Sequence, residues 1–234
     1  FYKDLIIISK KGTFPVKYKT IDNCILFEKG TIYARSLIDN SYSKLNNLNV
    51  FEQIRVSLQE AENQKLNCVI ELHKKKKIAI TNALEGLHTS GNYGLSGSIV
   101  YEDRNLFKGA ESLKLKVNGT AERQQADESA QVFNAFKYGG DLSLTIPKLL
   151  TALKENNVYD PAKRVNTIFS IGYNRLDRPS LGRTIVNSKI GYFWQKGNKK
   201  HWVNPIDIST VYIDDDSDLS GLSGTDLNQQ YSNF

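Results

Sequence analysis

The sequence predicts a small α+β unit followed by a long antiparallel β-sheet, and two patterns carry that prediction. Between residues 31 and 48, apolar side chains recur at steps of three and four, the period of a helix that packs on one side. From Lys77 onward, run after run alternates apolar and polar residues, the period of a β-strand, with polar turns between the runs. No helical period of comparable length follows, so the sheet forms the larger part of the chain.

The first 76 residues read as one small sheet with a helix over one face. Residues 1–20 look like the end of a preceding unit or a linker, and residues 21–27 are a strand candidate. The helix begins after Thr31, a possible N-cap, and Asn46 and Asn47 mark its end. Alternating runs at 54–58 and 66–72 then predict a hairpin around a polar turn.

Seven further strands are expected in the rest of the chain. They lie near residues 77–88, 93–103, 111–123, 135–146, 164–176, 183–196 and 201–213. In the third of them, Leu113, Leu115 and Val117 alternate with Lys114 and Lys116. A soluble sandwich can show such faces, but in long strands an apolar face opposite a polar one also suits a barrel with lipid outside and water inside.

Composition and charge set further bounds. No run approaches the ~18–20 apolar residues of a membrane-spanning helix. The net charge of +6 is scattered except for four lysines at 74–77, which fit a solvated turn better than a binding patch, and nucleic acid is not expected as a partner. At a membrane surface, the same lysines would lie close to phosphate head groups. The chain opens at Phe1 without a leader, so we expect a processed or truncated segment.

No catalytic, metal or cofactor site is expected, and we do not expect an enzyme. The three histidines fall in three different elements, and the acidic run at 214–218 lacks the spacing of a calcium loop. The sequon at 118–120 lies inside a predicted strand. Cys24 and Cys68 alternate with apolar neighbours, which favours buried free thiols, although a single disulfide remains open.

Several stretches of the chain resemble a known family. Residues 85–98 read EGLHTSGNYGLSGS and residues 101–111 read YEDRNLFKGAE, and both are closely similar to the start of the barrel in the BamA/TamA family of outer-membrane assembly factors. The similarity is greatest to the TamA-like branch. It continues through residues 139–147, 172–179, 191–194 and 204–207, and residues 45–56 resemble a POTRA domain, so it covers nearly the whole chain.

The resemblance implies an α+β POTRA domain followed by a partial antiparallel transmembrane β-barrel. The expected division is 1–20 for the end of a preceding unit or linker, 21–76 for the POTRA-like domain, and 77–234 for the N-terminal half of the barrel. Seven strands are about half of the roughly sixteen that the family implies. Because an open sheet edge in lipid is costly, the chain is not expected to be the entire functional protein.

The resemblance also implies a function, which is to help other β-barrel proteins fold and insert across the bacterial outer membrane. The first barrel strand would form a lateral seam at which an incoming client strand pairs, and the POTRA domain would lie in the periplasm. Expected partners are unfolded outer-membrane clients, outer-membrane lipids and a periplasm-spanning or inner-membrane partner. Two alternatives are a two-partner-secretion transporter and a passive porin or surface-binding barrel.

Three sets of site residues follow from this interpretation. The seam strand would present Ile78, Ile80, Asn82, Leu84 and Gly86. The lipid-facing set is Leu113, Leu115 and Val117. The interfacial aromatic set is Tyr101, Tyr192, Trp194 and Trp202, with Tyr93, Tyr173 and Tyr212 as further members.

Overall fold

The computed structural model of the chain describes residues 6, 8, 14–62, 65–89, 92–123, 133–150, 164–178, 181–196 and 199–214. Within these residues it has two helices and nine strands. The helices are α1 (Tyr18–Asp22) and α2 (Arg35–Asn47). The strands are β1 (Phe51–Ala61), β2 (Lys65–Lys74), β3 (Ile78–Thr89), β4 (Asn92–Asp103), β5 (Ser112–Arg123), β6 (Ala135–Ile146), β7 (Arg164–Arg178), β8 (Leu181–Lys196) and β9 (Lys199–Asp214).

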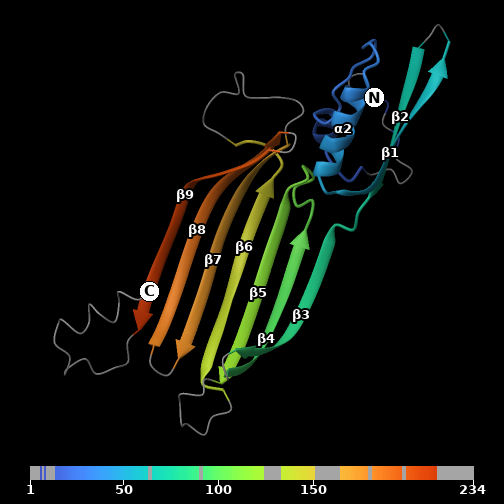
Figure 1. Cartoon of the computed structure of the whole chain (residues 1–234). Helices are drawn as coiled ribbons and strands as arrows, with labels where there is room; N and C mark the ends of the chain where they lie inside the picture. The colour runs from blue at the N-terminus through green and yellow to red at the C-terminus, as the bar shows by residue number, and fades with distance from the viewer. Residues whose placement is uncertain are drawn as a thin grey trace, which may run out of the picture.

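The N-terminal unit consists of the two helices and the β1–β2 hairpin (Figure 1). The hairpin is antiparallel, with Val56 opposite Ile70, as the sequence predicts. Leu45 of α2 is completely buried and packs in one core with Phe51 at the start of β1. That core also contains Val16, which comes from the segment that the sequence assigns to a preceding unit or linker.

The strand predicted at residues 21–27 is wrong: the short helix α1 ends at Asp22, residues 23–24 form a turn, and residues 25–27 belong to no strand. Ile21 and Cys24, three residues apart, both face the core, and the Cys24 amide donates to the Ile21 carbonyl at 2.8 Å. These turn-type bonds use the amides that a strand partner would need. Further along, the Leu26 amide donates to the Ser41 hydroxyl of α2 at 2.9 Å, so a helix side chain replaces a neighbouring strand.

The helix predicted from residue 31 is confirmed, but its start lies further along the chain. Thr31 does not cap it: its hydroxyl accepts the Glu28 amide at 3.1 Å and closes a tight turn, in which Gly30 has a φ of 88°. The helix begins at Arg35 after an extended Ala34, and no side chain caps it there.

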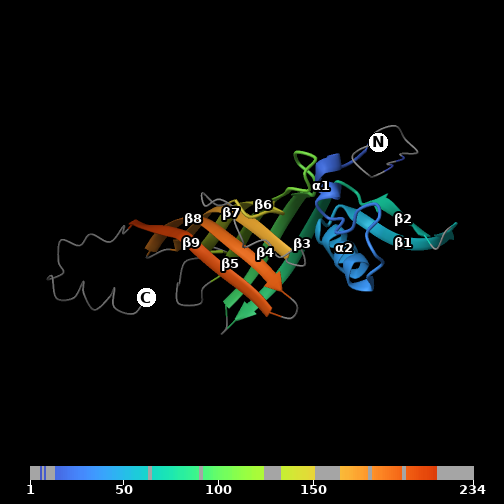
Figure 2. The same cartoon turned by 90° about the horizontal axis from the view of Figure 1, so that it is seen from above.

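The other seven strands form one antiparallel sheet in the order β3-β4-β5-β6-β7-β8-β9. All seven were predicted from the sequence to within two residues at each end. The sheet is not closed: within the described residues, β3 has a strand neighbour only in β4, and β9 only in β8. Figures 1 and 2 show the N-terminal unit beyond one end of this sheet. We call that end the near end and the opposite one the far end.

Candidate functional site: a two-faced sheet with an open edge

The register of the sheet separates an apolar face from a polar one. Directly paired residues of antiparallel neighbours point to the same side. One row therefore crosses all seven strands on one side: Ile80, Tyr101, Leu115, Leu142, Ile171, Ser188 and Ile208. The adjacent row lies on the other side: Thr81, Val100, Lys116, Asp141, Gly172, Asn187 and Ser209. We call the two sides the apolar face and the polar face.

The glycines show which side of the sheet is more crowded. A Cβ added to Gly139, on the polar face, would lie 2.5 Å from the backbone carbonyl oxygen of Tyr173. A Cβ on the adjacent Gly140, on the apolar face, would meet nothing nearer than 3.4 Å, and one on Gly119 would meet nothing within 4 Å. Side chains converge on the inside of a curved sheet and diverge on its outside. The polar face is therefore concave and the apolar face convex.

The convex face carries a band of exposed apolar side chains. Ile80 is 65% exposed and Ile171 is 52% exposed, although both are large and apolar. Where side chains are described, charged residues occur on this face only at its ends: Asp103 and Lys199 at the near end, and Arg123, Arg175, Asp177 and Asp214 at the far end. At the far end Arg175 is paired with Asp177 at 2.8 Å and with Asp214 at 3.0 Å. Transmembrane β-barrels have the same arrangement on their outer surface, where an uncharged apolar band lies between two polar rims.

The three residues predicted to meet lipid lie on this face, in a row that runs from its near end toward its middle. Leu113, Leu115 and Val117 are on the apolar face, and Leu115 and Val117 are 40% and 52% exposed. Lys114 and Lys116, between them in sequence, point to the polar face.

Aromatic residues gather at both ends of the apolar face. Three of the predicted residues are at the near end: Tyr101 is opposite Leu115, the Tyr192 hydroxyl donates to the Leu150 carbonyl at 2.8 Å, and Trp194 stacks on His201 at 5.2 Å. At the far end, Tyr93 stacks on His88 at 4.6 Å. Tyr138 and Tyr212 lie there too, whereas Tyr173 lies opposite Gly140 and Val186, closer to the middle.

Trp202 lies on the opposite side of the sheet from Tyr192 and Trp194. It pairs with Phe193 on the polar face, with ring centroids 4.4 Å apart. The cause is a register shift between β8 and β9, where Ile190 pairs with Ile206 but Tyr192 pairs with Val203. One extra residue in β9 inverts the alternation, which a strict period of two cannot indicate.

The concave face is lined by polar and oppositely charged pairs. Lys189 and Asp207 form an ion pair at 2.9 Å, and Lys116 lies opposite Asp141 in the register. A recess of ≈250 Å³ on this face lies among the polar residues Asp141, Ser170, Asn187, Lys189, Asp207 and Ser209. This face can hold water or a polar segment of protein, and it can neutralise charge of either sign.

The predicted seam strand is β3, the first strand of the sheet. Its five predicted residues, Ile78, Ile80, Asn82, Leu84 and Gly86, all lie on the apolar face. Leu84 is 76% exposed, and every residue from 81 to 86 is exposed on whichever face it occupies. One side of β3 is fully paired with β4 from end to end, and the other side has no strand neighbour in the described part of the chain. The free backbone groups of β3 therefore form an edge to which another strand can pair.

The reactive residues of the chain are dispersed. Cys24 and Cys68 are both free, and burial raises the pKa of the Cys24 thiol to about 11, although the charge of Lys44 partly offsets that rise. Burial also raises the pKa of Cys68. Over the described ranges no three His, Cys, Asp or Glu residues come together in a way that could hold a metal ion, and residues 215–218 of the acidic run lie outside those ranges.

Comparison with known proteins finds only distant structural matches. No protein-family model and no curated protein matches the chain. Among solved structures, CdiB from Acinetobacter baumannii matches at 13% identity over 85% of the chain, with a TM-score of 0.39. BamA from Haemophilus ducreyi lacking POTRA domains 1-3 matches at 13% identity over 79% of the chain, with a TM-score of 0.33. The chain spans 44% and 42% of those two structures, less than half of either. In the described residues there is no helix of the length and apolar character needed to cross a membrane.

Proposed function

We propose that this chain is part of an outer-membrane β-barrel that assists the folding and insertion of other barrel proteins. The single observation that carries the proposal is the combination of a convex apolar face, a concave polar face and a free edge strand in one sheet. The resemblance of residues 85–98 and 101–111 to the BamA/TamA family supports the same assignment. The proposed work breaks no covalent bond and needs no cofactor or metal.

The apolar face supports a position in lipid. In water, an exposed apolar band costs ~25 cal/mol per Å² relative to burial, so a sheet of this kind must be covered. Lipid covers the convex side of a barrel wall while water fills the concave side, and strands of 12–16 residues are long enough to cross the hydrocarbon when tilted. The outer membrane of a bacterium is where such walls occur, with the N-terminal unit in the periplasm.

The edge of β3 supports assembly rather than simple passage. A backbone edge within hydrocarbon leaves amide and carbonyl groups without partners, at several kcal/mol for each group. A weakly closed barrel would therefore open at β3 only when an incoming strand replaces the lost partner. An unfolded outer-membrane protein supplies such a strand, and β-augmentation at β3 would template its first hairpin.

The N-terminal unit would act as a POTRA domain that receives clients or a partner from the periplasm. The outer side of β2 is free in the two-stranded sheet of the described residues, so an extended segment can pair there. Only residues 75–77 separate β2 from β3. The free edge of β2 and the free edge of β3 are therefore close in sequence. A periplasm-spanning or inner-membrane partner would bind the same unit.

The competing functions differ in which face does the work. A two-partner-secretion transporter passes one substrate along the concave face, and a porin passes small solutes there; neither needs the edge of β3. A porin also has no need of the N-terminal unit, which makes it the weaker alternative.

A site-specific photo-cross-linking experiment separates these functions. A photoreactive phenylalanine analogue replaces Leu84 on the edge strand in the full-length protein, and the matched control carries it at Leu142 in the interior strand β6. Both leucines are exposed on the apolar face, so both meet lipid, but only Leu84 can meet an added strand. The expected result is cross-linking of unfolded barrel clients at Leu84 and not at Leu142.

Equal capture of clients at both positions, or none at Leu84 during active assembly, would remove the seam from the mechanism. A third probe at Lys116 on the concave face identifies the transporter. Capture of one exported substrate there, with no client at Leu84, would establish the secretion alternative.

A further inference from the structure

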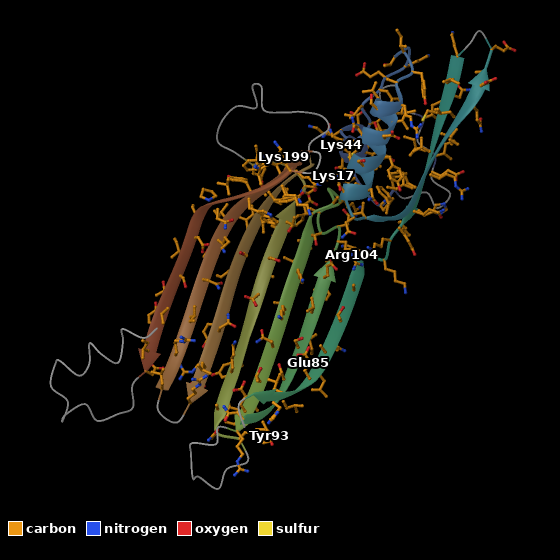
Figure 3. All side chains as sticks on the ribbon, viewed as in Figure 1. Lys17, Lys44, Glu85, Tyr93, Arg104 and Lys199 are labelled. Carbon is orange, nitrogen blue, oxygen red and sulfur yellow. The ribbon has the colours of Figure 1, made fainter. Side chains whose placement is uncertain are left out.

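The stretch at residues 101–111, which stands out in the sequence, forms the end of β4 and the turn into β5, and the turn lies against the N-terminal unit (Figure 3). We infer that this turn is a clamp that locks the N-terminal unit to the near end of the sheet. The unit and strands β3–β5 then move as one rigid body. We define the clamp as Pro15, Lys17, Asp103, Asn105, Lys108 and Ala110.

Asn105 is the centre of the clamp. Its side-chain amide donates to the Pro15 carbonyl of the N-terminal segment at 2.6 Å, while its side-chain oxygen accepts the Ala110 amide at 3.0 Å. One side chain therefore binds the unit with its donor and closes its own turn with its acceptor. Asn105 is only 8% exposed, so water does not easily replace either bond.

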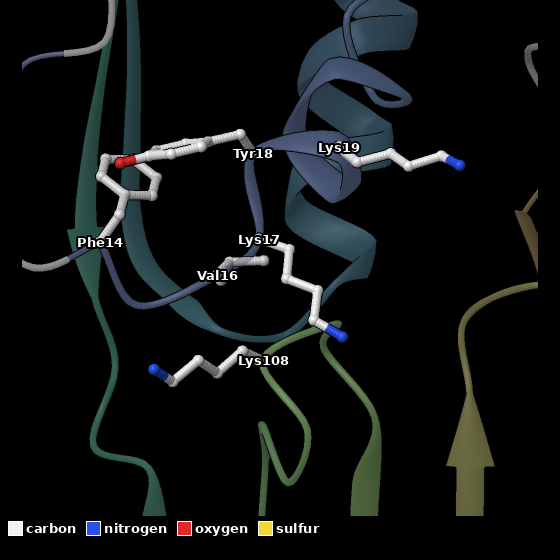
Figure 4. Close-up of a pocket in the computed structure, with 6 residues that line it drawn as sticks. All are labelled: Phe14, Val16, Lys17, Tyr18, Lys19 and Lys108. Carbon is white, nitrogen blue, oxygen red and sulfur yellow. The ribbon is translucent and has the colours of Figure 1, made fainter. Parts of the chain in front are cut away.

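Backbone and apolar contacts reinforce this bond. The Lys17 amide donates to the Lys108 carbonyl at 2.7 Å, and Figure 4 shows the side chains of these two lysines pointing apart. Ala110 is 5% exposed and belongs to the same buried core as Val16 and Phe51. The turn thus contributes a residue to the core of the N-terminal unit, and a turn that merely touched the unit would not.

The connector between β2 and β3 is held from both sides. The Lys75 amide donates to the Val50 carbonyl of the N-terminal unit at 2.9 Å. On the sheet side, the Arg104 amide donates to the Lys77 carbonyl at 2.9 Å, and Lys77 is paired with Asp103 at 3.1 Å. Asp103 also accepts the Asn105 amide at 3.0 Å, which links the connector to the clamp.

In the described part of the chain, the middle of β3 is held by its pairing with β4 and by no contact with the N-terminal unit. Residues 81–86 are exposed, and a Cβ at Gly86 would meet nothing within 4 Å. The clamp therefore keeps a receiving unit at a fixed distance from the near end of the edge strand while leaving the rest of that strand free. The rigid body itself does not depend on the proposed function; only its use in presenting clients to β3 does.

The test measures the distance between two spin labels by pulsed electron paramagnetic resonance in the full-length protein without client. The labels are placed at Ser43→Cys on α2 and Lys114→Cys on β5, two exposed positions, with Cys68→Ser as background and Cys24 protected by burial. Wild type is expected to give one narrow distance distribution. Asn105→Asp is expected to broaden it, because the carboxylate can still accept the Ala110 amide but has no proton to donate to Pro15.

Two further variants keep the test decisive. Lys17→Pro removes the amide donor without requiring a new φ, since Lys17 already has a φ of −59° that proline adopts, and it should broaden the distribution in the same way. Asn118→Asp on β5 is the matched control and should leave it narrow. A broad distribution in wild type, or a narrow one in both Asn105→Asp and Lys17→Pro, would overturn the clamp. Because no client is present, that outcome is independent of cross-linking at Leu84.

Discussion

At the scale of single residues, the buried thiol of Cys24 makes the stability of the N-terminal unit depend on alkaline pH. In the unfolded chain the thiol ionises near 9, whereas in the folded unit its pKa is about 11, because burial disfavours the thiolate. The folded state therefore holds the proton more tightly. This contribution is fully present below pH 9 and is lost as the pH rises toward 11.

We expect the free energy of unfolding of the unit to fall by about 2–3 kcal/mol between pH 9 and 11 through this thiol. Cys24→Ala should remove that part of the pH dependence, while Cys68→Ala, at the less buried thiol, should leave most of it. Urea unfolding followed by circular dichroism at several pH values measures both. If the free energy of unfolding fell equally with pH in wild type and in Cys24→Ala, the thiol of Cys24 would not be buried in its neutral form.

Two adjacent residues of β5 report on the two faces of the sheet. Replacing Leu115 by Arg places a charge in the apolar band and should destabilise the inserted protein by about 2–4 kcal/mol. Lys116→Arg keeps a charge on the concave face and should change stability little. The measurement is urea unfolding in detergent or lipid vesicles. Equal losses for the two variants would mean that the faces are not distinguished by lipid.

At the scale of elements, the curvature of the sheet is set where glycines meet the next strand. Gly139→Ala would drive its Cβ against the backbone of β7, which cannot move aside as a side chain can, and should cost about 1–3 kcal/mol. Gly140→Ala, on the convex face, should be neutral or slightly stabilising, because alanine loses less chain entropy than glycine. The unfolding temperatures of the two variants can be compared by heating samples before gel electrophoresis. Similar midpoints would mean that the close contact at Gly139 does not set the curvature of the sheet.

The elements also show what the sequence could and could not indicate. Strands β3–β9 were predicted closely because each alternates between lipid-compatible and polar residues and ends at a polar turn. The segment around Ile21 and Cys24 was mistaken for a strand because the neighbouring apolar run suggests an extended chain. The spacing of three between these two residues, which fits a helical turn, was the signal that was missed. The sequence placed Trp202 at a strand end but could not indicate its face, because the bulge that inverts the alternation of β9 depends on pairing with β8.

Contacts between distant residues lay beyond the sequence altogether. Asn105 and Pro15 are 90 residues apart, and no local pattern relates them. The only signal for this contact was the family resemblance of residues 101–111. That resemblance marked the stretch as important but did not indicate which residues it contacts. The direction of curvature was equally hidden, since alternation defines two faces but not which of them is concave.

At the scale of the whole molecule, the proposal requires a protein that crosses the outer membrane with its N-terminal unit on the inner side. The full-length protein should fractionate with the outer membrane and resist extraction by salt or alkali, because its apolar band is held by lipid. In intact cells an added protease should leave the exposed β1–β2 hairpin uncut. After the outer membrane is made permeable, the same protease should cut there while the strands β3–β9 stay protected. Cleavage of the hairpin in intact cells would reverse the orientation, and recovery of a soluble monomer without detergent would exclude the barrel.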